Sequence, residues 1–202
     1  MYFVSSNDYK FKEIKELLSE FSSTRLIVEH KKLKLEEIQS SSLGDVAKAK
    51  AIHAFNIIGN EVLVEDDGLF IESLNDFPGV YSSFVYDTLG NIGILDLLKN
   101  KKNRRATFKS LIAYYDGKNM KTFSGQVNGL ISERIFEGGW GFDPIFIPEN
   151  MDISFAQMDL NSKNKYSHRK LALKEFYSWY IKYNNNLEDG NVTRSNLQSS
   201  AK

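Results

Sequence analysis

Two segments near the N-terminus carry apolar residues at the spacing of an amphipathic helix. In residues 8–21 the apolar positions are Phe11, Ile14, Leu17, Leu18 and Phe21. Residues 45–58, DVAKAKAIHAFNII, repeat the pattern with small and branched side chains. The periodicity therefore predicts one helix over 8–21 and another over 45–58.

Short apolar runs lie before and after these helices. MYFV at 1–4, RLIVEH at 25–30 and the run over 61–66 have the length and composition of strands. Strands that alternate with helices are typical of an α/β protein with a partly parallel sheet. We therefore expect these three runs to form strands.

The pattern changes beyond residue 100. β-branched and aromatic residues are frequent in 104–135, and the turn sequence DGKN at 116–119 separates two strand-like runs. This arrangement predicts a β-hairpin. The predicted fold class is α/β, with a two-lobed, mixed and twisted sheet flanked by helices.

A last helix is expected to follow Ser167, whose side chain suits an N-cap. Its apolar stripe consists of Leu173, Phe176, Tyr177, Tyr180 and Ile181. Residues 184–202 are polar and lack periodicity, so we expect a mobile C-terminal tail there. The predicted organisation is a single two-lobed domain over 1–183 followed by this tail.

Composition excludes several classes of protein. The 202 residues are 42% hydrophobic, which is enough for one sizeable core or two small lobes. The formal net charge is +0, so we expect no broad electrostatic contact with nucleic acid or an acidic membrane. The absence of cysteine excludes disulfides, thiolate zinc sites and cysteine nucleophiles. The first apolar run is too short for a signal peptide and no segment matches a membrane span, so we expect a cytoplasmic protein.

Three carboxylates in a row, Glu65, Asp66 and Asp67, follow the apolar residues 62–64 and precede Gly68, which we expect to break the chain. Buried acids are unfavourable unless they are paired or bind a cation. In open α/β sheets, strand ends face ligand crevices, and carboxylate oxygens there suit Mg²⁺. The alternative, which the sequence supports equally, is that Asp66 or Asp67 caps the following turn.

SSNDYK at 5–10 lies at a strand-to-helix junction, where free N–H groups and the helix dipole favour an anion. Lys10 lies in the first turn, where a cation opposes the dipole unless an anion lies between them. An ordinary N-cap with a solvated lysine explains the same residues, and no P-loop pattern is present. In EEIQ, Glu37 is a second candidate metal ligand, and Lys50 on the next helix is a candidate phosphate contact. Taken alone, a Glu in a polar loop usually faces solvent.

Glycines flank Trp140 and Phe142 in GGWGFDPIF, residues 138–146. Either ring could face a planar ligand, although such a pair more often lies in a core. Asp143 precedes a proline, which favours an extended backbone there.

SKNKYSHRK, residues 162–170, gathers Lys163, His168 and Arg169 around a helix N-terminus. A lone His–Arg pair is common in proteins. A polar cluster beside a helix cap nevertheless suits an oxygen-rich ligand.

The order of these stretches is more specific than any one of them. The chain closely resembles the inosine triphosphate pyrophosphatase family in five blocks: SSNDYK, EIQ, EDDGLFIESLNDFPGVYSSF, GWGFDPIFIPE and FAQMDLNSKNKYSHRKLAL. The resemblance runs from about residue 3 to residue 180. It implies a hydrolase with an active-site cleft between two lobes, which removes non-canonical purine nucleoside triphosphates such as ITP, XTP and dITP.

The resemblance also implies a role for each motif residue. The implied triphosphate contacts are Ser5, Ser6, Asn7, Asp8, Tyr9, Lys10 and Lys50. Glu37 and Asp66 are the implied Mg²⁺ ligands, and Asp66 is the implied catalytic acceptor of the water's proton. The residues implied around the purine are Trp140, Gly141, Phe142, Asp143, Lys163, His168 and Arg169.

The chain departs from the family pattern at a few positions. Asp67 stands where the family usually has Ser or Thr, and Gln157 replaces a common Glu. Residues 83–84 are Ser and Phe, where some members carry Lys or Arg. Successive side chains of a strand point to opposite faces, so we expect Asp67 to bind near the substrate without sharing the metal with Asp66.

The implied partners are a nucleoside triphosphate, Mg²⁺ and a second copy of the chain, with FPGVYSSFVYD as a plausible homodimer interface. We expect no nucleic-acid or membrane partner. Two rival functions remain, a pyrophosphatase for other modified nucleotides and a non-catalytic nucleotide-binding protein. The presence of Lys10, Glu37 and Asp66 argues against the second rival.

Overall fold

The computed structural model describes the backbone of residues 1–21 and 26–199 and the side chains of residues 1–21 and 26–185. One mixed sheet of seven strands runs through the molecule in the order β2-β1-β3-β5-β6-β7, with β4 added to β3. β1 is parallel to β2 and β3, and the remaining pairs are antiparallel. The strands are β1 Tyr2–Val4, β2 Glu29–Lys31, β3 Val62–Ile71, β4 Phe77–Gly79, β5 Arg105–Tyr115, β6 Met120–Ile131 and β7 Phe146–Pro148.

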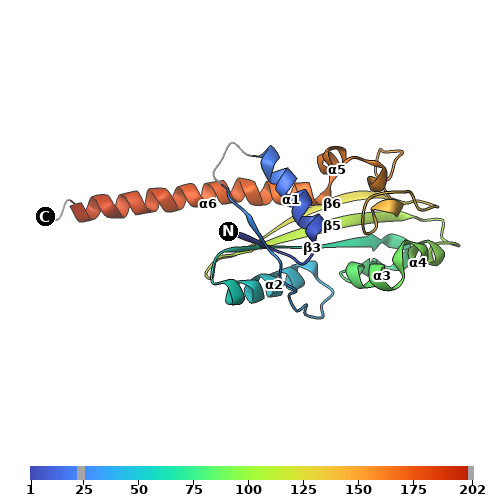
Figure 1. Ribbon diagram of the computed structural model, residues 1–202, viewed down its shortest axis with the longest axis horizontal. Helices are drawn as coiled ribbons and strands as arrows, with labels where there is room; N and C mark the ends of the chain where they lie inside the picture. Colours follow the sequence, from blue (N-terminus) through green and yellow to red (C-terminus); the bar gives the residue numbers. More distant parts are fainter. Residues whose placement is uncertain (22–25, 200–202) are drawn as a thin grey trace.

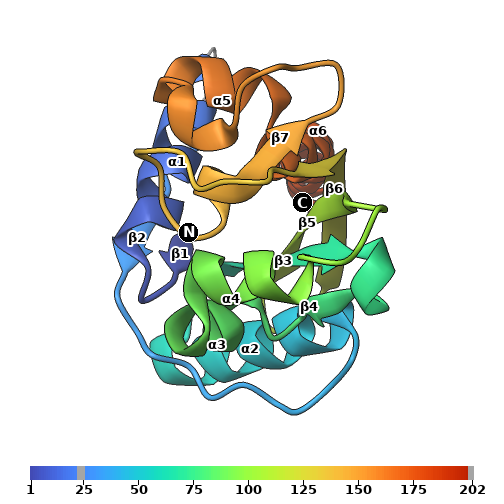
Figure 2. The same ribbon diagram turned by 90° about the vertical axis from the view of Figure 1, so that its right-hand side faces the viewer.

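Helices cover both faces of this sheet. They are α1 Asp8–Glu20, α2 Leu43–Ile58, α3 Ser82–Thr88, α4 Gly90–Leu97, α5 Leu160–Tyr166 and α6 His168–Ser199. Short 3-10 turns occupy Glu72–Leu74, Asp143–Ile145 and Phe155–Gln157. α1 and α6 lie on one face and α2 on the other (Figure 1). In Figure 2, α5 lies with α1, whereas α3 and α4 lie with α2.

Most of the elements predicted from the sequence are confirmed. α1 and α2 match the two predicted helices. Asn7 and Ser42 are their N-caps, and their side-chain oxygens accept hydrogen bonds from backbone N–H groups of the first turn. β5 and β6 form the predicted hairpin, with Tyr115 opposite Met120 across the turn. The Ser167 hydroxyl accepts from the Lys170 N–H at 3.0 Å, as expected of a cap.

Two predicted strand boundaries are wrong. Residues 26–28 lie outside β2, which begins at Glu29, and residues 22–25 lie outside the described part. β3 does not end at the acids but continues to Ile71, so the acidic triplet lies within the strand. At Gly68 the backbone of β4 lies so close to β3 that an added Cβ would meet the Gly79 carbonyl oxygen. The glycine thus permits close backbone approach and does not break the strand.

The two predicted lobes share this single sheet. On the α1–α6 face, Phe3, Leu63 and Ile112 pack against helix residues such as Leu17 and Phe176. On the other face, three strand valines and Ala113 pack against Ala47, Ala51 and Ala54 of α2. A third core lies where α3, α4 and β7 meet β3 and β5. The sheet is therefore covered on both sides beside the acidic triplet.

Helix α6 is longer than the predicted last helix. It runs to Ser199 and projects beyond the sheet, so most of the predicted tail over 184–202 is helical (Figure 1). The mobility of that segment stays a prediction, and residues 200–202 lie outside the described part. None of the helices in the described ranges is both long and apolar enough to span a membrane.

Candidate active site

The acidic triplet lies at a free stretch of the β3 edge. On this side, β1 pairs with Val62 and Leu63, and β4 pairs with residues 69–71. β5 pairs with the whole of β3 from the other side. Among the described strands, none pairs with residues 64–68 on the free side.

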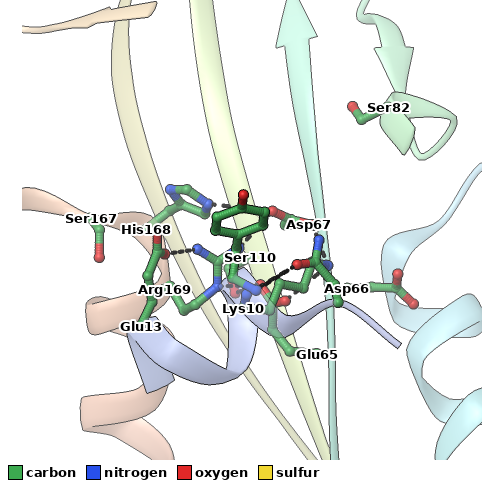
Figure 3. Close-up of polar contacts among 12 residues, drawn as sticks. Lys10, Glu13, Glu65, Asp66, Asp67, Ser82, Ser110, Ser167, His168 and Arg169 are labelled. Carbon is green, nitrogen blue, oxygen red and sulfur yellow. Dashed lines mark hydrogen bonds and ion pairs between the residues drawn. The ribbon is translucent and has the colours of Figure 1, made fainter. Parts of the chain in front are cut away.

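The three acids divide between the two faces of the sheet. Because side chains alternate along a strand, Asp66 points towards α2, and Glu65 and Asp67 point towards α1 and α6. Figure 3 shows the carboxylates of Asp66 and Asp67 directed apart. The free edge therefore separates two polar groups of different composition.

The group on the α2 side consists of Glu37, Lys50 and Asp66. The Lys50 Nζ lies 2.8 Å from a Glu37 carboxylate oxygen and 3.0 Å from Asp66 Oδ1. The other Asp66 oxygen is buried and has no hydrogen-bond partner among the described residues. Burial raises the pKa of Asp66, although the positive charges of Lys50 and Lys10 oppose the shift.

The group on the α1–α6 side surrounds Arg169, whose side chain is fully buried. The guanidinium contacts Asp67 at 2.7 Å and Glu65 at 3.2 Å, and it also pairs with Glu13. Lys10 joins the same group, with its Nζ 3.0 Å from Glu65 and 2.5 Å from Asp67. Burial opposes the charge of Asp67, but Lys10 and Arg169 hold its pKa well below the usual range.

Glu13 connects this group to the tryptophan loop. Its carboxylate accepts from the Trp140 indole N–H at 2.9 Å and from the Lys163 Nζ at 2.7 Å. Lys163 also contacts Asp143, at 2.6 Å. Burial would raise the pKa of Glu13, but Arg169 and Lys163 outweigh it and lower the value to about 2. Glu13 is therefore ionised and holds three donors in one place.

Aromatic rings lie on this side as well. The Trp140 ring stacks on the exposed Tyr9 ring, with centroids 5.8 Å apart. Phe142, in contrast, is buried in the third core and meets Tyr86 edge-on. The His168 ring stacks on Phe108 at 4.9 Å, and burial lowers its pKa. Of the aromatic candidates, the stacked pair of Trp140 and Tyr9 thus fits a planar ligand best.

The SSNDYK segment is already partly capped by its own side chains. The Asn7 Oδ1 accepts from the Tyr9 and Lys10 N–H groups, and the Ser5 hydroxyl accepts from the Asn7 N–H. Ser6 is exposed, and Asp8 pairs with Lys32 at the surface. Of this segment, Lys10 alone contacts the acidic triplet.

The structure thus brings the sequence candidates together in two groups. Their members are Glu37, Lys50 and Asp66 on one side, and Lys10, Asp67, Trp140, Asp143, Lys163 and Arg169 on the other. Gly141 lies in the same loop as Trp140, but its carbonyl faces Asn91 of α4.

Glu13 and Ser110 belong to the α1–α6 group but were not predicted from the sequence, and Glu65 was noted in the acidic triplet without a role of its own. The Ser110 hydroxyl donates to Glu65 at 2.7 Å. The position of Glu13 in the sequence could have indicated a buried acid, because it lies one turn after Lys10 and beside Ile14 on the apolar face of its helix. An acid at such a position needs a buried partner.

Comparisons with known proteins agree with this arrangement. The model of the Ham1 family matches residues 1–179. A Methanopyrus kandleri protein named dITP/XTP pyrophosphatase is 44% identical over 180 residues, which cover 88% of this chain and 94% of the relative. A Thermococcus kodakarensis protein of the same name is 45% identical over 178 residues, 88% of this chain and 95% of the relative.

Solved structures show the same fold. The Ham1 protein of Staphylococcus aureus has a TM-score of 0.75 at 25% identity, covering 91% of this chain and 100% of its own. A HAM1 protein from Coxiella burnetii also has a TM-score of 0.75, at 28% identity, covering 90% and 99%. The resemblance inferred from the five sequence blocks is thereby confirmed, and the chain belongs to the Ham1 family.

Proposed function

We infer that this protein hydrolyses non-canonical purine nucleoside triphosphates, such as dITP, XTP and ITP, to the monophosphate and pyrophosphate. Membership of the Ham1 family and relatives named dITP/XTP pyrophosphatase support this function. The observation that carries it is the position of Asp66, which shares Lys50 with Glu37 while the adjacent Asp67 contacts Arg169 on the other face. A substrate lying across the free edge of β3 would reach both groups.

The α2-side group fits a Mg²⁺ ion, which we propose as the cofactor. Mg²⁺ in nucleotide enzymes is commonly bound by one or two carboxylates together with substrate phosphates and water. Glu37 and Asp66 are two such carboxylates, and Asp66 has a buried oxygen without a partner among the described residues. No group of three or more His, Asp or Glu residues suited to a metal occurs in the described ranges, so phosphate oxygens would have to complete the site. A bound Mg²⁺ would neutralise triphosphate charge and lower the pKa of a water molecule.

Asp66 is the proposed proton acceptor. In the proposed reaction a water oxygen bonds to the α-phosphorus while the bond to the bridging oxygen breaks, so that pyrophosphate leaves. Asp66 takes the proton of the water, and burial favours this because it raises the pKa of the carboxylate. Lys50 and Lys10 are the proposed phosphate contacts, because each ammonium group contacts at least one carboxylate of the acidic triplet beside the free edge of β3.

The α1–α6 group is the proposed base site. Trp140 offers a ring for stacking, and the donors Lys163, His168 and Arg169 suit the 6-oxo group of hypoxanthine or xanthine. Adenine carries an amino donor at that position, so it would face these N–H groups without accepting a hydrogen bond from them. Such a mismatch can discriminate strongly between substrates.

A homodimer is also proposed. Large apolar side chains on and beside α3 and α4 are at least 40% exposed: Tyr81, Phe84, Tyr86, Leu89, Ile92 and Leu97. Large exposed apolar side chains gathered on one pair of helices are typical of an interface. Because the nucleoside triphosphate pool is cytoplasmic, we propose the cytoplasm as the site of action.

A panel of nucleoside triphosphates assayed with and without Mg²⁺ tests the proposed function. We expect pyrophosphate and monophosphate from ITP, dITP and XTP, little turnover of ATP, and no turnover after chelation. Release of orthophosphate alone would contradict attack at the α-phosphorus. A preference for modified pyrimidines would favour the first rival function, and binding without turnover would favour the second.

A further inference from the structure

Helices α3 and α4 contact the loop that carries Trp140, here called the base loop, residues 138–143. The Asn91 Nδ2 of α4 donates to the Gly141 carbonyl at 3.1 Å. The Tyr86 ring of α3 meets the Phe142 ring edge-on, with centroids 5.5 Å apart. Two successive residues of the base loop are therefore held from the same pair of helices.

The backbone of the base loop has few steric limits at its three glycines, although Trp140 and Asp143 bond to each other within the loop. Gly138, Gly139 and Gly141 have φ values of 92°, 63° and 58°. Glycine in this region has no Cβ to restrict the backbone. A Cβ added at Gly141 would meet no atom within 4 Å, so close packing does not hold this residue. Contacts with other elements therefore determine where the loop lies.

These contacts hold the loop from two sides. Trp140 is held by the Glu13 carboxylate at its indole N–H and by the ring of Tyr9. Asn91 holds the next residue from α4. Because a peptide unit is planar, fixing the Gly141 carbonyl also fixes the direction of the Phe142 N–H. The loop is thus held between α1 and α4, while Gly138 and Gly139 lie close against Ala156.

The orientation of the Asn91 amide follows from this contact. A carbonyl can only accept, so the amide must present its nitrogen to Gly141. The Asn91 Oδ1 is then buried without a partner among the described residues, which is unfavourable. Within α4 the side chain makes no hydrogen bond that would explain an amide here, whereas the bond to the base loop does.

We infer that Asn91 and Tyr86 are positioning residues of the base site, an inference that rests on the proposed function. They lie outside the five sequence blocks, and only their contacts with the base loop indicate this role. By fixing Gly141 and Phe142, they keep Trp140 near Lys163 and Arg169, whose charged groups lie 5.2 Å and 5.5 Å from the Trp140 ring centroid. Their loss should weaken base binding more than the chemical step.

Trp140 can report on the loop directly. The chain has two tryptophans, so a Trp179→Phe background leaves Trp140 as the single fluorophore. Selective excitation of the indole then excludes the ten tyrosines. In this background Asn91→Asp keeps the shape of the side chain but removes the donor, and Asn91→Gln keeps a donor. Thr88→Ala is the matched control, because it removes a hydroxyl from α3 that bonds only to carbonyls of that helix. Tyr86→Leu removes the second contact and serves as an independent variant should Asn91→Asp fold poorly.

We expect Asn91→Asp to increase acrylamide quenching of Trp140 and to raise the KM for ITP about fivefold, the effect of one lost hydrogen bond, with kcat changed less. Tyr86→Leu should act in the same direction, and Asn91→Gln should restore part of the loss. The inference is overturned if Asn91→Asp and Tyr86→Leu both match Thr88→Ala in quenching and KM, or if only kcat falls. If the unmodified protein released no pyrophosphate from ITP, the proposed function would fail, while Trp140 quenching would still decide whether Asn91 holds the loop.

Discussion

Asp66 and Asp67 are neighbours in β3, yet their carboxylates belong to different charge groups. Asp66 lies 3.0 Å from Lys50 of α2, and Asp67 lies 2.7 Å from Arg169 of α6. The alternation of side chains along the strand separates them. The two acids therefore cannot share one ion while β3 keeps this geometry.

Their substitution should have unequal effects. Asp66→Asn should lower kcat by about 10²–10⁴-fold, because it removes the proposed proton acceptor and one proposed metal ligand. Asp67→Ser should stay clearly active with Mg²⁺, because Arg169 keeps Glu13 and Glu65 as partners. Steady-state kinetics on proteins of equal melting temperature measures both. The reverse ranking would mean that Asp67 carries the chemistry.

Arg169 and its neighbour Lys170 offer a matched pair for stability. Arg169→Ala would leave three carboxylates without their shared buried partner and should cost about 3–5 kcal/mol in the free energy of unfolding. Lys170 pairs with Glu20 near the surface, so Lys170→Ala should cost about 0–1 kcal/mol. Urea unfolding measures both. Equal losses of stability in the two variants would contradict a structural role for the buried pairs. A change in the preference of Arg169→Ala for ITP over ATP must be measured on folded protein.

Glu13 should make the protein sensitive to acid. Its pKa is lowered from 4.5 to about 2 in the folded state, so its contribution is complete above pH 4.5 and is lost as the pH falls towards 2. The contribution corresponds to roughly 3 kcal/mol. Glu13→Gln should therefore be less stable at pH 7 and should lose less stability between pH 4.5 and 2. Unfolding curves across this range test the slope, and an unchanged slope would contradict the assignment.

Gly68 should tolerate no side chain. In Gly68→Ala the Cβ would run into the Gly79 carbonyl oxygen, and a rigid backbone cannot give way easily, so we expect a loss of about 1–3 kcal/mol. Gly44→Ala is the control, because the nearest atom to its Cβ is the Ser42 hydroxyl at 3.4 Å and alanine favours a helix. Thermal unfolding compares the two. A Gly68→Ala protein as stable as Gly44→Ala would show that β4 can move away from β3.

Removal of residues 186–202 should leave activity and melting temperature nearly unchanged. This segment is polar and lacks an apolar stripe in the sequence. The truncated chain keeps Tyr180 and Tyr183, which bond to Glu61 and Asp116 at the core end of α6. Activity assays and calorimetry on the shortened protein test this. A large loss of either property would show that the segment packs against the rest of the protein.

Local signals in the sequence determined most of the secondary structure. Helix periodicity, the cap signals in SSND and at Ser167 and the DGKN turn act within a few residues of the chain, and each predicted an element that the structure contains. The alternation of β-strand side chains also predicts that Asp66 and Asp67 lie on opposite faces of the sheet. Family resemblance supplied the proposed roles, because the five blocks occur in order.

The tertiary structure decided what these local signals could not. Whether Gly68 ends β3 depends on β4, whose backbone packs where a side chain would lie. Glu13 is 156 residues from Arg169, and only the docking of α1 beside α6 brings them together. The hydrogen bond from Asn91 to the Gly141 carbonyl likewise joins residues that are 50 positions apart in the sequence. Such pairings depend on how whole helices pack against the sheet. Patterns among residues that are close in the sequence do not determine this packing.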